Sequence, residues 1–70
     1  MKVYPSAGGR TLWVTDTEAH PIERVTTHAL LSGYVPRSQM VRLVNSRQDG
    51  KGVRWYEFKL QKVSNRKDLT

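Results

Sequence analysis

Residues 53–63 form one continuous run in which residues 56–61 alternate strictly between apolar and polar side chains. Tyr56, Phe58 and Leu60 fall on one face of an extended strand, because successive side chains of a strand point to opposite faces. The opposite face takes Val53, Trp55, Glu57, Lys59 and Gln61. A strand of this length needs a pairing partner. The turn-forming residues 48–52 (QDGKG) connect it to residues 39–46, so we predict a C-terminal β-hairpin.

Two further elements are predicted earlier in the chain. Residues 11–15 (TLWVT) are β-branched and aromatic, which is typical of a short strand. Residues 21–32 predict a helix, because one stripe of helical spacing collects Ile22, Val25, Ala29 and Leu30. Pro21 suits the first helical position, and Gly33 suits the residue just past the end.

These elements predict an α+β fold, in which one helix packs on a small antiparallel sheet with a C-terminal β-hairpin. Seventy residues are enough for one small domain, 1–70, and leave no room for a second. The Pro, Ser and Gly residues near the N-terminus predict flexibility over residues 1–10, and the polar C-terminus predicts it over 64–70. We expect Trp13, Tyr56 and Phe58 to contribute to the core, and Trp55 to lie on the other face of its strand.

Two other folds are compatible with the pattern. Residues 21–32 are poor in helix-forming side chains, so an extended segment there, in a small all-β barrel, is one alternative. In the other, HALLSGY and VPRSQMVRLV resemble the second half of a helix-turn-helix, with DGKGVRWYEF as a wing. The resemblance is to small excisionase-like winged-helix proteins and implies a DNA-binding winged helix. Gly33 falls one place too early for the common motif, and the run 53–63 is longer than a wing needs.

The sequence offers little for catalysis or metal binding. It has no cysteine, which excludes disulfides, thiolate zinc sites and cysteine nucleophiles. His20 and His28 stand eight residues apart, whereas ligand pairs on a helix are usually three or four apart. We therefore predict a protein that is not an enzyme and that has no cofactor and no metal site. The polar N-terminus and the lack of a long apolar stretch predict a cytoplasmic protein without membrane contact.

The positive charge is concentrated in the C-terminal half. The formal net charge is +6, but residues 1–36 carry equal numbers of cations and anions. Residues 37–67 carry nine Lys and Arg against only Asp49 and Glu57. A net charge of about 2 to 8 is ordinary for a small soluble domain, so the clustering is the informative feature. A clustered basic surface is typical of proteins that bind polyanions.

We therefore predict a small, basic, non-enzymatic protein that binds DNA or RNA, such as a phage- or plasmid-type regulator of transcription. Arginine suits phosphate and guanine recognition, and aromatic rings suit base stacking. The predicted binding residues are Arg37, Arg42, Arg47, Lys51, Arg54, Trp55, Lys59 and Lys62. The alternative is a protein-interaction module that binds an acidic surface of a host macromolecular machine and modulates it, because such interfaces are also enriched in Arg and aromatic residues. The sequence leaves open whether the protein is a monomer or a homodimer.

Overall fold

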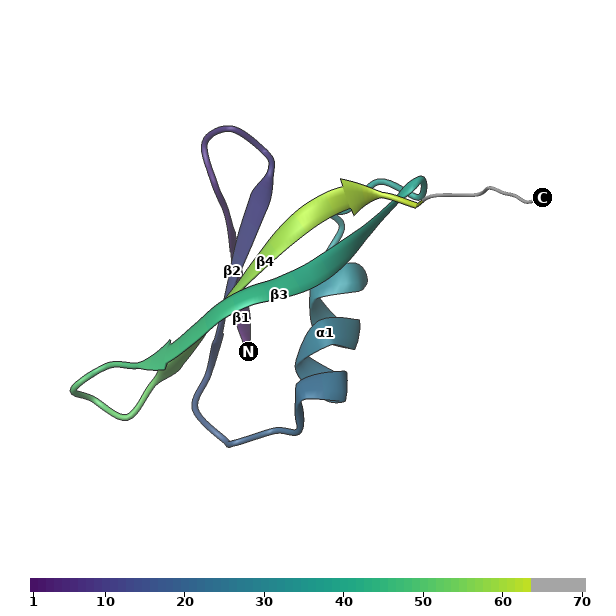
Figure 1. The fold of residues 1–70 in the computed structure, drawn as a ribbon. Coiled ribbons are helices and arrows are strands. Elements are labelled where there is room, and N and C mark those ends of the chain that lie inside the picture. Colours follow the sequence, from purple (N-terminus) through teal and green to yellow (C-terminus); the bar gives the residue numbers. More distant parts are fainter. Residues whose placement is uncertain (64–70) are drawn as a thin grey trace.

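A computed structural model describes residues 1–63, which form a four-stranded sheet and one helix. The elements follow in the order β1 (Lys2–Pro5), β2 (Thr11–Asp16), α1 (Ile22–Leu30), β3 (Gln39–Gln48) and β4 (Arg54–Lys62). The sheet has the order β1-β2-β4-β3, and every neighbouring pair is antiparallel. Figure 1 views the sheet close to edge-on and shows α1 on one side of it only.

The core lies between α1 and the sheet. Alternate residues of the strands face the helix, and burial of each large apolar side chain contributes about 1.5–3 kcal/mol. The buried apolar residues are Leu12, Val14, Val25, Ala29, Val41, Tyr56 and Phe58. The helix supplies only Val25 and Ala29 to this core, while Ile22 and Leu30 at its two ends are exposed. The single short helix covers one face of the sheet, and no other element of residues 1–63 covers the opposite face.

The predicted α+β fold is confirmed, including the helix and the C-terminal hairpin. The all-β barrel is wrong, because residues 22–30 are helical despite their low helix propensity. Burial of Val25 and Ala29 against the sheet outweighs that propensity, as tertiary packing usually does. The winged-helix alternative is also wrong, because its second helix would lie where β3 pairs with β4.

Two other expectations need correction. Residues 1–10 were predicted to be flexible, but residues 2–5 form β1, whose pairing with β2 is held across the turn by Ser6 N–H donating to Thr11 O at 2.9 Å. Trp13 was predicted in the core, but it lies on the uncovered face because it alternates with the buried Leu12 and Val14. The prediction for 64–70 lies outside the described residues.

A β-bulge in β3 changes which side chains share a face. Leu43 pairs with Phe58 and Asn45 pairs with Glu57, so Val44 is the extra residue between them. One extra residue reverses the alternation of every side chain that follows it. Arg42 and Arg47 are five positions apart and would face opposite sides of a regular strand. The bulge puts both of them on the side away from α1, where Arg42 lies opposite Lys59 and Arg47 lies opposite Trp55.

Candidate nucleic-acid interface

The uncovered side of the sheet, which we call the open face, carries a cluster of three aromatic rings. Tyr4 on β1 and Trp55 on β4 are stacked, with ring centroids 5.9 Å apart and an angle of 26° between the ring planes. Trp13 on β2 meets Trp55 edge to face at 6.2 Å. We call Tyr4, Trp13 and Trp55 the aromatic cluster. Since Trp13 and Trp55 are the only tryptophans of the chain, every indole lies on this face.

Arg47 completes the cluster from the edge strand. Its side chain reaches across β4, and its guanidinium carbon lies 5.8 Å from the centre of the Trp13 ring. A cation this close to an indole is attracted to the ring, by about 0.5–1 kcal/mol at an exposed site. A shallow depression of about 190 Å³ is lined by Tyr4, Trp13, Arg47 and Trp55. The depression therefore has aromatic walls and a cation at its margin.

Asp49 in the β3–β4 turn fixes the position of Trp55. The indole Nε1–H donates to Asp49 Oδ2 at 3.2 Å, and the other carboxylate oxygen accepts from the backbone N–H groups of Lys51 and Val53. The hydrogen bond from Trp55, together with these amides, lowers the pKa of Asp49 below its ordinary value. The polar group of the indole is satisfied within the protein, so Trp55 presents mainly its apolar ring to a ligand.

The open face is positively charged. Four cations, Lys2, Arg42, Arg47 and Lys59, share it with one carboxylate, Glu57. Arg42 Nε donates to Gln61 Oε1 at 3.3 Å, which is a contact with a neutral side chain. Within residues 1–63, no lysine or arginine forms an ion pair with a carboxylate, and the close contacts of basic side chains to carboxylates are those of the His20 ring with Asp16 and Glu18. The four cations of the open face are therefore available to a bound anion.

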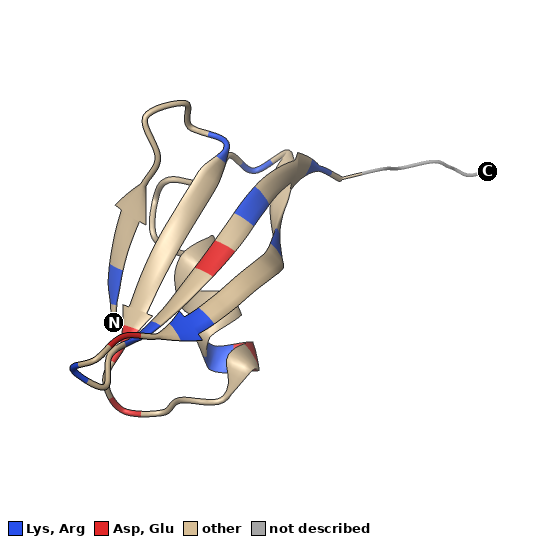
Figure 2. Ribbon diagram, turned by 60° about the vertical axis from the view of Figure 1, so that its left-hand side comes forward, with Lys and Arg blue, Asp and Glu red and all other residues tan. Residues whose placement is uncertain are grey.

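The structure brings together about half of the residues predicted for binding. Arg42, Arg47, Trp55 and Lys59 lie on the open face. By strand alternation, Arg54 and Lys62 at the two ends of β4 lie on the side of α1, whereas Arg37 precedes β3 and Lys51 lies in the β3–β4 turn. Figure 2 likewise shows the Lys and Arg segments spread over strands, loops and helix rather than gathered at one end.

Three residues of the open face were missed from the sequence. Lys2 and Tyr4 lie in the segment that was expected to be flexible, and Trp13 was assigned to the core. For Trp13 a signal was present. Leu12, Val14 and Asp16 alternate with Thr11, Trp13 and Thr15, so a strand with Leu12 inside must carry Trp13 outside.

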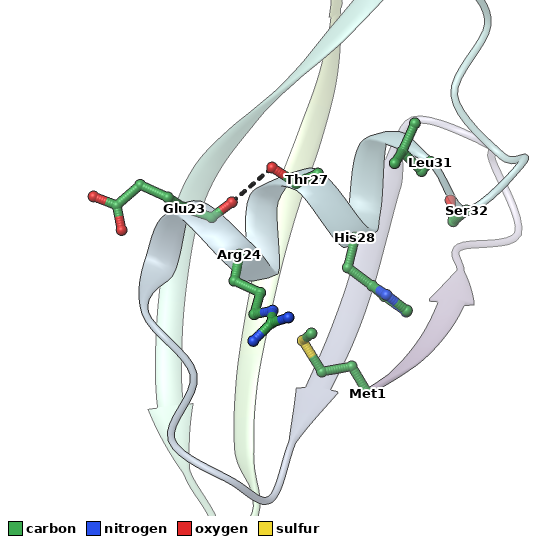
Figure 3. Close-up of a pocket in the computed structure, with 7 residues that line it drawn as sticks. All are labelled: Met1, Glu23, Arg24, Thr27, His28, Leu31 and Ser32. Atoms are coloured by element: carbon green, nitrogen blue, oxygen red, sulfur yellow. Dashed lines mark hydrogen bonds between the residues drawn. The ribbon is translucent and has the colours of Figure 1, made fainter.

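A larger hollow of about 520 Å³ lies between α1 and Met1 (Figure 3). It is an open groove in which no lining residue is fully buried. The hydroxyls near His28 are not directed at its imidazole. Thr26 and Thr27 donate to the carbonyls of Ile22 and Glu23 at 2.9 Å, and Ser32 donates to the carbonyl of Ala29 at 2.7 Å. The groove thus lacks a nucleophile paired with a base.

The two histidines could supply imidazole ligands to a metal, and the closest contacts of His20 are with Asp16. His20 Nδ1 contacts Asp16 Oδ1 at 2.8 Å, and the backbone N–H of His20 donates to Asp16 Oδ2 at the same distance. Among residues 1–63 no three His, Cys, Asp or Glu side chains gather in a way that could hold a metal ion.

In the same part of the chain, no helix has the length and apolar character needed to span a bilayer.

Comparison of the chain with protein-family models, with curated proteins and with solved structures finds no match.

Proposed function

We propose that this protein is a small, non-enzymatic nucleic-acid-binding protein that uses the open face of its sheet. The observation that carries the proposal is the aromatic cluster on an uncovered sheet face, beside four cations that make no ion pair within residues 1–63. Cations that follow the phosphates and rings that stack on bases are the two components of nucleic-acid binding by a surface of this kind.

The placement of the rings supports binding rather than folding alone. Aromatic residues contribute most to a fold when they are buried in its core, which here already contains Tyr56 and Phe58. Tyr4 is 44% exposed at an edge strand, where its ring adds little to the core. Exposed aromatic residues next to arginine are typical of binding surfaces.

Salt dependence tests the proposal. Each neutralised phosphate contributes about −0.7 (single strand) to −0.9 (duplex) to the slope of log K against log salt, so four cations predict a slope of roughly −3 to −4. Titration of a short oligonucleotide at several salt concentrations measures this slope. An affinity that does not change with salt, or no binding at low salt, would contradict the proposal.

An acidic protein surface is the alternative partner, and a nuclease-controlled pulldown distinguishes it. Because nucleic acid holds the complex together in our proposal, material captured by the tagged protein should be released when the lysate is treated with nuclease. A single protein retained in stoichiometric amount after nuclease would instead support the interaction module. The full chain is used in both arms, so the C-terminal cations remain present.

A further inference from the structure

The size and chemistry of the depression in the open face indicate what it can hold. Pockets for drug-sized ligands measure about 300–1,000 Å³, whereas this depression measures about 190 Å³. Its lining consists of three rings and one guanidinium group. A small planar aromatic group stacks favourably on such a lining, and a phosphate attached to that group would be attracted by Arg47.

The nucleobases of a duplex cannot reach these rings with their faces. In double-stranded DNA or RNA the faces of the bases are stacked on one another, and only the edges are presented in the grooves. The major groove of B-DNA is about 12 Å wide. A four-stranded sheet with strands about 4.8 Å apart measures more than about 14 Å across its backbones alone, so the open face does not fit into that groove flat. In a single strand the bases are free to turn their faces to a protein.

The rings are held in place before any ligand arrives. Trp55 is fixed by its hydrogen bond to Asp49, which is itself held by two backbone amides of the β3–β4 turn. Trp13 contacts Trp55 edge to face and also packs against the guanidinium group of Arg47. A preformed surface loses less side-chain entropy on binding, which favours affinity.

We propose that the open face binds single-stranded nucleic acid in preference to duplex, with a base stacked in the depression lined by Tyr4, Trp13, Arg47 and Trp55. This inference rests on the proposed function and adds the class of ligand and the stacking residues to it. Tyr4, Trp13 and Trp55 form the stacking surface. Arg47 binds the adjacent phosphate, and Lys2, Arg42 and Lys59 bind phosphates further along the strand.

Intrinsic tryptophan fluorescence tests the inference, because both indoles lie at the site. The full-length protein is titrated with a short single-stranded oligothymidylate and with a duplex of the same length. We expect strong quenching by the single strand and an affinity at least tenfold above that for the duplex. Polyglutamate serves as a polyanion without bases and should give neither quenching nor comparable affinity.

Variants of Tyr4 test the stacking itself. Loss of one base stack weakens binding by about five- to 150-fold, so Tyr4→Leu should reduce single-strand affinity within that range. Tyr4→Phe keeps the ring and should recover most of the affinity that Tyr4→Leu loses, since the phenol hydroxyl takes no part in stacking. The matched control is Tyr34→Leu, because Tyr34 is 50% exposed in the loop after α1 and lies outside the cluster. This control should bind like the wild type.

The outcomes separate the inference from the proposed function. Equal affinity for duplex and single strand would overturn the inference and leave nucleic-acid binding intact, as would an unchanged affinity in Tyr4→Leu. Failure of both oligonucleotides to bind would overturn both. Polyglutamate that binds as tightly as the oligonucleotide would show that the face recognises charge alone, and would also overturn both. If Tyr4→Leu does not fold, the affinities of the wild type for the single strand, the duplex and polyglutamate still test the inference.

Discussion

Reversing the charge of both arginines on the open face, in Arg42→Glu/Arg47→Glu, is expected to weaken nucleic-acid binding at least about a hundredfold at low salt. Each arginine donates charge-assisted hydrogen bonds worth about 1.5–3 kcal/mol, and each glutamate adds repulsion from the phosphates. The salt slope should also become shallower by about 1.4 to 1.8, because two phosphate contacts are lost. Fluorescence titration at several salt concentrations measures both quantities.

The control for this variant carries the same change in charge at other positions. Arg10 lies in the loop between β1 and β2, and Arg24 lies on α1. Arg10→Glu/Arg24→Glu alters the net charge equally and should weaken binding much less, through the long-range field alone. An equal loss of affinity in the two double variants would mean that binding depends on net charge and not on the open face.

Asp16→Asn is expected to destabilise the fold by about 2 kcal/mol or more at neutral pH, and so to lower Tm by roughly 10 °C. The carboxylate of Asp16 is 2% exposed. It accepts hydrogen bonds from the backbone N–H groups of Glu18 and His20 and contacts the His20 imidazole, at 2.8–3.0 Å. These bonds shape the connection to α1, in which Ala19 has a positive φ of 55°. In asparagine, the amide NH₂ replaces one of the two oxygens, so one of the backbone N–H donors would face another donor and lose its acceptor.

The ionisation of Asp16 also makes the stability of the fold depend on pH. Burial raises the pKa of Asp16, but the hydrogen bonds from Glu18 and His20 together lower it by more. A carboxyl whose pKa is lower in the folded state stabilises the fold fully above its ordinary pKa of 3.8. That contribution is lost as the pH falls through the lower folded-state value. The difference in Tm between wild type and Asp16→Asn should therefore persist down to about pH 4 and shrink below it.

Asp49→Asn provides a matched comparison for this variant. Asp49 also accepts three hydrogen bonds, but it is exposed in the β3–β4 turn. Because water can replace the bonds of an exposed group, its loss should lower Tm less than the loss of Asp16 does. A larger effect for Asp49→Asn, or an unchanged Tm in Asp16→Asn, would contradict the role assigned to Asp16.

Local patterns in the sequence were sufficient for most of the fold. The alternation within residues 53–63 and the turn residues before them predicted the hairpin, because both signals arise within a few neighbouring residues. The helix at 22–30 was predicted from its apolar stripe and its flanking Pro21 and Gly33. By contrast β1 was missed, since a four-residue strand carries little pattern of its own and depends on pairing with β2.

The site was harder to predict, because it depends on which face each side chain takes. Charge pointed to the C-terminal half and found Arg42, Arg47 and Lys59, but it also selected Arg54 and Lys62, which lie toward α1. Arg42 and Arg47 share a face because of the bulge at Val44. The residue pattern of one β-strand taken alone does not reveal a bulge of this kind. The aromatic cluster joins three strands that are distant in sequence, so it emerges only once the strand order is known.

Nucleic acid is expected to bind on the open face, and an NMR titration of the isotopically labelled protein with a single-stranded oligonucleotide maps the binding surface residue by residue. We expect the largest shifts at the indole N–H signals of Trp13 and Trp55 and at the backbone amides of β1, β2 and β4, with α1 nearly unchanged. Shifts concentrated on α1 and the groove beside Met1, or no shifts at all, would contradict binding on the open face.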